Sequence, residues 1–211
     1  MAENSDPNID WETKCGHPLK IVAGVDEVGR GCLAGPVVAA AVVLPAEISF
    51  EANPWLLKVT DSKLLTAKKR EELAPLISSW ALYSDVAFAS IEEIDSINIH
   101  HASQLAMRRA LKKLNVGIDH VVIDGKFKLS GISCDSTAIV KGDRKCLSIA
   151  CASILAKVWR DNLMVRLDEE YPGYDFAIHK GYPTPAHTEA LKKRGVSPIH
   201  RRSFAPVAKL L

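Results

Sequence analysis

Five acidic residues stand at positions from which their carboxylates could meet. Asp26 and Glu27 are adjacent and follow a short apolar run, and Asp124 follows a second apolar run. Asp143 precedes a long helical pattern, and Asp161 lies within that pattern. Several carboxylates at close range either share protons or hold a hard cation such as Mg²⁺ or Mn²⁺. Such clusters carry out phosphoryl transfer around two metal ions, so the pattern favours metal-dependent phosphodiester chemistry.

Each acid taken alone has an ordinary explanation. An Asp-Glu pair after a strand is usually a surface turn, and an Asp before a helix, such as Asp143, is usually an N-cap. Asp161 follows Lys157 by four residues, which is the spacing of a helical ion pair. The recurrence of an acid after an apolar run is what favours a shared site. On spacing alone, Asp143 and Asp161 are equal candidates for the fourth carboxylate.

A short glycine-rich segment follows the first two acids and places Arg30 between Gly29 and Gly31. Glycine lets backbone amides approach a ligand closely, and the arginine supplies a cation for a phosphate. The pattern matches neither the dinucleotide-binding fingerprint nor the P-loop. The GxSxG serine elbow is also missing from the sequence, so nucleotide-cofactor binding and acyl transfer are disfavoured.

Buried strands are the elements that would bring these residues together. Apolar runs predict neighbouring strands at 19–25 and 37–44, because the loop between them is short. Further strands are predicted at 80–89, 120–124 and 137–140. Since the strands before Asp26 and Asp124 would end at one edge of the sheet, their carboxylates would converge where open α/β sheets bind ligands.

Helical patterns alternate with the later strands and predict an α/β or α+β layered fold. Pro75 is expected to bend or shorten the first helix, and residues 90–93 form a capping box. The predicted helices cover residues 66–79, 98–114, 145–170 and 185–194.

The composition limits the classes of protein to which this chain can belong. The chain has 211 residues, of which 47% are hydrophobic and 25% charged, enough for one large domain or a domain with an appendage. The polar first dozen residues exclude a signal peptide, and the longest apolar stretch is too short for a membrane span. The five cysteines lack CxxC spacing, so we expect reduced packing residues in a cytoplasmic protein.

Positive charge is concentrated at the C-terminal end. Residues 180–211 hold seven Lys/Arg and one acid, a net charge of +6 in a chain of net charge +2. This asymmetry is typical of contact with a polyanion such as nucleic acid, although charge alone favours a solvated helix face.

Eight segments, taken together and in order, resemble the type 2 ribonuclease H family, the bacterial ribonucleases HII. The resemblance covers residues 19–207 and leaves residues 1–18 outside it. The matching segments are AGVDEVGRG (23–31), DSKL (61–64), INIH (97–100), VIDG (122–125), VKGD (140–143), ASILAK (152–157), HKGYPT (179–184) and HRRSF (200–204).

The resemblance implies an RNase H-like mixed sheet flanked by helices. We expect a flexible N-terminal segment at 1–18, a catalytic domain at 19–170 and a basic, helical substrate-binding extension at 171–211. The resemblance also implies cleavage of RNA in RNA–DNA hybrids and incision at single ribonucleotides in duplex DNA. Family members use two Mn²⁺ or Mg²⁺ ions and leave 3′-hydroxyl and 5′-phosphate ends. A monomer is expected, with nucleic acid as its partner.

By the same resemblance, the catalytic and metal-binding carboxylates are those in the matching motifs, and Asp161 becomes an ion-pairing residue. These carboxylates are Asp26, Glu27, Asp124 and Asp143. The family's ribose-reading residues correspond to Gly29, Arg30, Gly31 and Tyr182. Phosphate contacts are expected from Lys63, Ser153, Lys157 and Lys180.

Two other functions share parts of this pattern. A nucleic-acid-binding module without nuclease activity would keep the basic end but needs no acid cluster, because carboxylates repel phosphate. A DNA nuclease of the wider RNase H-like group would need the acids but not the Gly-Arg-Gly segment or Tyr182.

Overall fold

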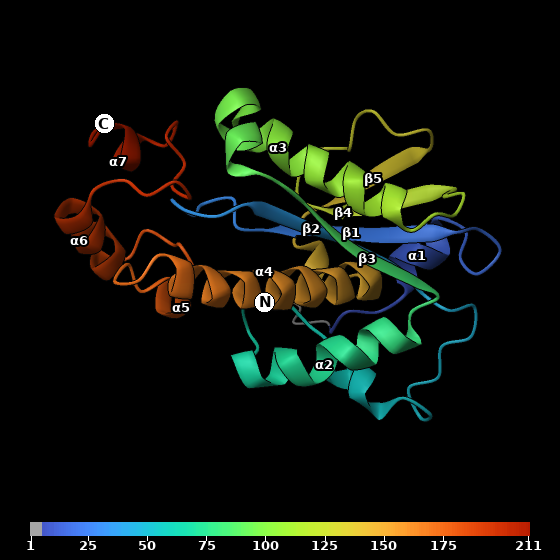
Figure 1. The fold of residues 1–211 in the computed structure, drawn as a ribbon. Helices are drawn as coiled ribbons and strands as arrows, with labels where there is room; N and C mark the ends of the chain where they lie inside the picture. Colours follow the sequence, from blue (N-terminus) through green and yellow to red (C-terminus); the bar gives the residue numbers. More distant parts are fainter. Residues whose placement is uncertain (1–5) are drawn as a thin grey trace, which may run out of the picture.

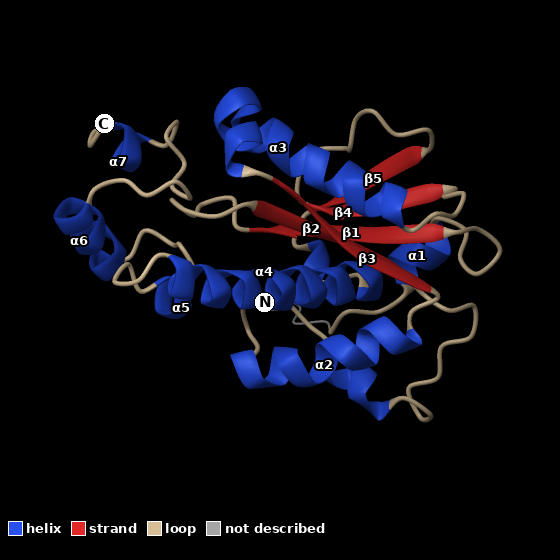
Figure 2. Ribbon diagram, in the orientation of Figure 1, coloured by secondary structure: helices blue, strands red, loops and turns tan. Residues whose placement is uncertain are grey.

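A five-stranded mixed sheet with helices on both faces forms the centre of the computed structural model, which describes residues 6–211 (Figure 1, Figure 2). The strand order is β3-β2-β1-β4-β5; β1 pairs antiparallel with β2 and parallel with β4. The strands are β1 (Val22–Val28), β2 (Val37–Val43), β3 (Tyr83–Ala89), β4 (His120–Asp124) and β5 (Asp135–Ile139). The predicted α/β class with a mixed sheet is confirmed.

Helix α3 covers one face of the sheet, and α4 covers the other with α2 packed outside it (Figure 1). The helices are α1 (Asp10–Lys14), α2 (Ala67–Trp80), α3 (Ile91–Lys113), α4 (Leu147–Glu170), α5 (Phe176–His179), α6 (Pro185–Arg194) and α7 (Ala205–Ala208), with 3₁₀ turns η1 (Pro54–Lys58) and η2 (Gly142–Arg144). Helices α5, α6 and α7 form the predicted helical C-terminal part. Within residues 6–211 we find no helix with the length and apolarity needed to cross a membrane.

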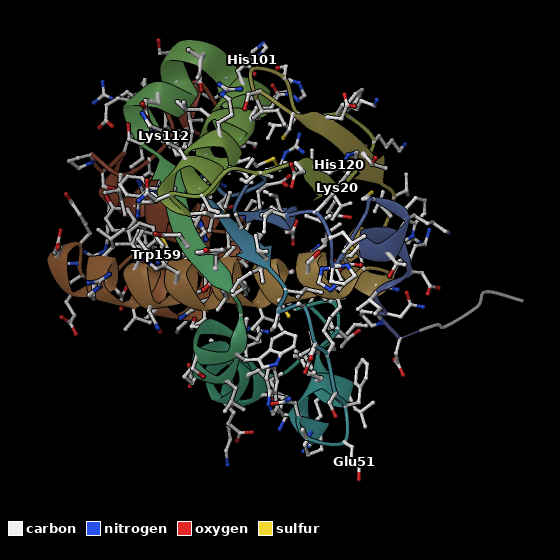
Figure 3. The ribbon with its side chains drawn as sticks, turned by 90° about the vertical axis from the view of Figure 1, so that its right-hand side faces the viewer. Lys20, Glu51, His101, Lys112, His120 and Trp159 are labelled. Atoms are coloured by element: carbon white, nitrogen blue, oxygen red, sulfur yellow. The ribbon has the colours of Figure 1, made fainter. Side chains whose placement is uncertain are left out.

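The core is built from small residues on the central strands. All seven residues of β2 are buried, with Ala39 and Ala41 facing α3 and Ala40 facing α4. A Cβ at Gly24 of β1 would overlap Ser148 of α4, so glycine permits this helix to cross directly over the strand. Trp159 lies on α4 where it passes the edge strand β3, and its ring stacks on Phe88 (Figure 3). Small residues on the strands therefore allow α4 to pack close to the sheet.

Strand β1 lies three residues further along the chain than predicted. Leu19 is 97% exposed and outside the sheet, whereas pairing with β2 continues to Val28, which is opposite Val38. Asp26 and Glu27 therefore belong to the strand rather than to the turn after it. β3 and β5 also differ from their predicted ranges at one or both ends, because Trp80 closes α2 and β5 begins at Asp135.

Helix α3 begins seven residues before the predicted start at 98. The predicted capping box is present: Ser90 Oγ accepts from the Glu93 amide, and Glu93 accepts from the Ser90 amide. Asn98 then interrupts the helix at φ 63°, and its side chain accepts from the amides of His100 and His101. The two start signals are therefore two successive caps within one kinked helix. Helix α2, by contrast, runs through Pro75 without being shortened.

The segment 1–18, predicted to be flexible, contains the short helix α1 in its described part. Glu12 of α1 is buried and accepts a 2.8 Å hydrogen bond from the Ser148 amide in the first turn of α4. A carboxylate at a helix N-terminus satisfies an orphan amide and complements the helix dipole. Residues 1–5 of this predicted segment lie outside the described residues.

Candidate active site

Strand register brings three of the predicted acids to one edge of the sheet. Val25 of β1 lies opposite Ile123 of β4, so Asp26 and Asp124 follow side by side on parallel strands. Asp143 lies in η2, the turn between β5 and α4, where the Gly142 amide donates to Asp124 at 2.7 Å. Asp26 and Asp143 are 6% and 5% exposed, respectively. The expected convergence of carboxylates therefore occurs, and it occurs in a buried setting.

Glu27 approaches this edge from the other face of the sheet. Successive side chains of a strand point to opposite faces. Asp26 has Ser153 of α4 beside its carboxylate, whereas Glu27 lines a hollow with Ser103 and Met107 of α3. Asp124 also lines this hollow, at the end of β4. The adjacent acids thus flank the end of β1 from two sides.

The acids perturb one another because they are buried together. Burial, followed by the negative charges of Glu27, Asp124 and Asp143, raises the pKa of Asp26 well above its usual range. Burial together with Asp124 and Asp61 raises the pKa of Asp143 to about 6. Burial also raises the pKa of Glu27, although Arg30 opposes this shift. The site holds more negative charge than its own cations compensate.

Three of the four carboxylates accept a hydrogen bond from a local donor. Asp26 accepts from the Glu27 amide at 2.8 Å, Asp124 accepts from Gly142, and Glu27 pairs with Arg30 at 3.0 Å. Within residues 6–211, no three Asp, Glu, His or Cys side chains already form a closed metal cage. Binding a cation by several of these acids would therefore require side-chain rotation.

The chemistry of the donors nevertheless fits a hard divalent cation. The acids supply only oxygen ligands, which suit Mg²⁺ and Mn²⁺. Besides burial, the negative charge of Asp124 contributes to the raised pKa values of Asp26, Glu27 and Asp143, so a positive charge placed among these acids would be stabilised. Asp26, Asp124 and Asp143 are the residues that would hold such a cation from the α4 side, with Glu27 reaching it around the end of β1.

The Gly-Arg-Gly segment lies directly after β1 and touches the acids. Arg30 forms its ion pair with Glu27, while half of its own side chain stays exposed. Gly31 is exposed, and a Cβ added to it would meet no atom within 4 Å. The same loop contacts the C-terminal part, because Leu33 and Gly35 donate their amides to the carbonyls of Gly181 and Ile199. Figure 1 shows this loop extending from the sheet toward α5 and α6.

Tyr182 lies on the segment that this loop contacts. It is half-buried next to Cys32, and the Lys157 ammonium lies 5.4 Å from the centre of its ring. Asp161 pairs with Lys157 at 2.8 Å and with Arg70 at 3.3 Å. Asp161 is therefore engaged by two cations on α4 and α2, as expected for a structural ion pair.

Three buried histidines fix the backbone around Tyr182. His187 Nδ1 must donate to the Tyr182 carbonyl at 2.9 Å, so its Nε2 accepts from His200 Nε2 at 3.1 Å. His200 Nδ1 then accepts from Ser197, and His179 Nδ1 accepts from the Gly181 amide. Burial lowers the pKa of His200 to about 4 and also lowers the pKa of His187, so this pair stays neutral at physiological pH.

The remaining predicted residues lie around the acids at different depths. Ser153 is buried and hydrogen-bonded to Ser62, whereas Lys63 is exposed beside the site. Lys180 is half-buried, and its carbonyl accepts from Arg160. Of these three residues, Lys63 is therefore the most exposed.

Sequence reasoning missed a buried acid next to the site. Asp61 is 3% exposed and accepts from the Lys63 amide and from two nitrogens of Arg144, the nearer at 2.9 Å. Burial raises its pKa, but these hydrogen bonds and cations outweigh the effect and lower it overall. The signal was present, since Asp61 opens the DSKL motif, yet this motif drew attention only to its lysine.

Comparisons with known proteins agree on one family. Residues 23–207 match the sequence profile described as Ribonuclease HII. A ribonuclease HII from Ruegeria pomeroyi is 52% identical over 191 residues, which cover 90% of this chain and 78% of that protein.

Solved structures share the fold. Ribonuclease H2 from Pyrococcus horikoshii OT3 superposes with a TM-score of 0.73 at 27% identity, covering 90% of this chain and 96% of that one. Bst-RNase HIII, solved in complex with Mn²⁺, has a TM-score of 0.71 at 22% identity, covering 93% and 71% of the two chains. The chain therefore belongs to the ribonuclease HII family, whose members are metal-dependent hydrolases that cleave RNA in RNA–DNA hybrids.

Proposed function

We propose that this protein incises duplex DNA at single embedded ribonucleotides, in addition to cleaving RNA–DNA hybrids, and leaves 3′-hydroxyl and 5′-phosphate ends. The proposal depends on one observation: a buried, uncompensated acid cluster lies directly beside the Gly-Arg-Gly loop, joined to it by the Glu27–Arg30 ion pair. The cluster supplies the hydrolytic chemistry, and the loop supplies contact with the sugar.

Asp26, Glu27, Asp124 and Asp143 would hold two divalent ions, Mg²⁺ or Mn²⁺, at the edge of the sheet. Such ions activate water and stabilise the attacking and leaving oxygens of an in-line displacement. The protein's own contribution is to bury and orient the carboxylates: Gly142 fixes Asp124, and α4 covers Asp26 with Ser153. If Glu27 held an ion in place of its ion pair with Arg30, the Arg30 guanidinium would be free to bind a substrate phosphate.

Recognition of the ribose would come from Gly31 and Tyr182. Gly31 has neither a positive φ nor a neighbour that a Cβ would meet, so the fold itself does not require glycine there. A substituent-free Cα instead suits close approach of a ligand to the backbone, here the 2′-hydroxyl that distinguishes RNA from DNA. Tyr182 presents a flat ring beside Lys157, as expected for packing against the sugar.

Backbone contacts of the duplex would come from the basic C-terminal part. Lys192, Lys193 and Arg194 lie in the last turn of α6, and Lys63, Ser153, Lys157 and Lys180 lie nearer the acids. Contacts of this kind release counterions, so binding should weaken steeply with salt. A cytoplasmic location is consistent with five free cysteines.

One assay tests the proposal. A labelled duplex with one ribonucleotide, an all-DNA duplex of the same sequence and an RNA–DNA hybrid are incubated with Mn²⁺, with Mg²⁺ or with EDTA. We expect metal-dependent cleavage of the first and third substrates and none of the all-DNA duplex. Cleavage of the all-DNA duplex would identify a DNA nuclease, and binding without cleavage would identify a nucleic-acid-binding module. Cleavage of hybrids alone would refute incision at single ribonucleotides.

A further inference from the structure

Two buried arginines lie beneath the Gly-Arg-Gly loop, outside the acid cluster. Arg160 of α4 and Arg201 of the C-terminal part are both fully buried. No Asp or Glu within residues 6–211 forms an ion pair with either guanidinium. Burying an unpaired charge is strongly unfavourable unless hydrogen bonds compensate it, so the contacts of these residues indicate what they do.

Arg201 donates to three carbonyl oxygens of one loop. Its Nη2 contacts Gly29 at 2.7 Å, its Nη1 contacts Arg30 at 3.0 Å, and its Nε contacts Gly35 at 2.9 Å. Burial lowers the pKa of Arg201 to about 10, which leaves the group protonated at neutral pH. One guanidinium thus binds both ends of the segment that connects β1 to β2.

Arg160 joins the same loop to the segment that carries Tyr182. Its Nε donates to Pro36 at 3.0 Å and its Nη2 to Ala34 at 3.0 Å, while its Nη1 donates to Lys180 at 2.8 Å. Gly29 has φ +92°, and a Cβ there would overlap the Arg160 side chain. Glycine at this position is therefore required for the arginine to fit under the loop.

Peptide geometry turns these contacts into an orientation of the amides. The loop peptides are trans, so each C=O and the N–H of the next residue point in opposite directions. Because the carbonyls of Gly29 and Arg30 point inward to Arg201, the amides of Arg30 and Gly31 point outward. Neither amide donates to an acceptor in the described part of the chain, and both residues are exposed. Two free donors therefore face the side from which a ligand can approach.

We propose that Arg201 and Arg160 are positioning residues for ribose recognition: they hold the amides of Arg30 and Gly31, and the Tyr182 segment, in their reading geometry before nucleic acid binds. This inference rests on the proposed recognition of the ribose by that loop. Neither arginine touches the substrate, so each acts through the backbone carbonyls it binds.

Arg201→Lys is the sharpest test. The substitution keeps the positive charge, but the single nitrogen of lysine cannot donate to three separate carbonyls as the guanidinium does. Dissociation constants are measured in EDTA, where no cleavage occurs, for a duplex with one ribonucleotide and for its all-DNA counterpart. The wild type should prefer the ribonucleotide, and the variant should lose this preference by about tenfold, the effect of one or two hydrogen bonds. Its affinity for the all-DNA duplex should stay unchanged. A preserved preference would overturn the inference.

Arg109→Lys is the matched control. Arg109 also makes three hydrogen bonds, to the Phe88 carbonyl and to both oxygens of Glu93, but none of them is to the loop. We expect it to lower the melting temperature without changing the preference for the ribonucleotide. If both lysine variants lowered the preference equally, Arg201 would have only a general structural role.

Two further measurements keep the test decisive. Arg160→Lys should also lower the preference, because it frees the Tyr182 segment. In the wild-type protein without nucleic acid, ¹⁵N relaxation should give Arg30 and Gly31 order parameters of about 0.85, and values below about 0.6 would overturn the inference even if no variant folded. A wild type with no preference for the ribonucleotide would instead refute the proposed function, whatever the arginine variants did.

Discussion

The acid cluster at the end of β1 and the arginine-supported loop that follows it both bury like charges, but they differ in how those charges are satisfied. Burial raises the pKa values of Asp26, Glu27 and Asp143, and the negative charge of Asp124 raises all three further. Arg160 and Arg201 also lie close together, yet each donates to three backbone carbonyls. The acid cluster therefore needs a cation from outside the chain to compensate its charge. The two arginines, in contrast, already have hydrogen-bond partners within the chain.

This difference separates two ways of building a site. A cluster of repelling carboxylates gains free energy when a cation enters, so its geometry is completed by binding. A loop whose carbonyls are held by buried arginines loses its conformational entropy during folding, so its amides are already ordered before a ligand binds. Changes at the acids should therefore affect turnover and metal response, and changes at the loop should affect discrimination between sugars.

Asp124→Asn should have the largest effect. The asparagine oxygen can still accept from the Gly142 amide, so the local turn is preserved while the negative charge is lost. We expect single-turnover cleavage in Mn²⁺ to fall about a thousandfold or more. The melting temperature in EDTA should stay the same or rise, because one repulsive charge has been removed. Turnover near the wild-type rate at saturating metal would remove Asp124 from the site.

Gly31→Ala should have a smaller effect that is confined to sugar recognition. The added methyl meets no protein atom, so folding should be unaffected, but it occupies the space that a ribose would enter. We expect kcat/KM on the single-ribonucleotide duplex to fall about tenfold, through the loss of one or two contacts.

Gly117→Ala is the control for this substitution. A methyl group added at Gly117 would likewise have no atom within 4 Å, and this glycine has no positive φ, but it lies after α3, away from the loop. It should leave kcat/KM unchanged. Equal losses in the two variants, or none at Gly31, would contradict close approach of the sugar to this backbone.

The metal response should depend on pH in a direction set by the raised pKa values. Asp143 titrates at about 6 when folded, above its ordinary 3.8, so its proton is bound more tightly in the folded state. In the metal-free protein this group therefore lowers stability above about pH 6, and the penalty disappears as the pH falls toward 4. A divalent ion removes the same penalty but must compete with protons at low pH.

Mn²⁺ should accordingly raise the melting temperature more at about pH 7.5 than at about pH 5. We expect a gain of about 4 to 8 °C at the higher pH and less than half of that at the lower pH. Thermal unfolding with Mn²⁺ or EDTA at both pH values measures this, and Asp143→Asn should reduce the gain at the higher pH. An equal gain at both pH values would show that the ion binds elsewhere.

The sequence was sufficient to predict that Asp26 and Asp124 lie close together, because an acid after each of two apolar runs is a local pattern. It did not predict that Asp26 and Glu27 lie within β1 and face opposite sides, since the end of β1 depends on its pairing with Val38 of β2. Arg160 did leave a signal: it follows the buried Ala156 by four residues on α4. Arg201 belongs to the matching segment HRRSF, but its role could not be predicted, because its three carbonyl partners lie more than 160 positions away along the chain.

The choice of the fourth acid shows the same limit of local patterns. Asp143 and Asp161 are equivalent by spacing, but the structure gives Asp161 two cationic partners, Lys157 and Arg70, and gives Asp143 none among the described salt bridges. An acid already paired with two cations has little reason to bind a metal ion, whereas an unpaired buried acid does.

Asp161→Asn should therefore have the smallest effect on activity. It breaks a partly buried ion-pair network, so we expect a loss of about 1 to 2 kcal/mol in the free energy of unfolding. Cleavage measured well below the melting temperature should fall less than about threefold, since no reacting group is removed. Asp143→Asn, compared at the same temperature, should lose at least about a hundredfold in rate while unfolding no more easily than the wild type. The opposite ranking of the two variants would mean that α4, rather than the η2 turn, supplies the fourth carboxylate.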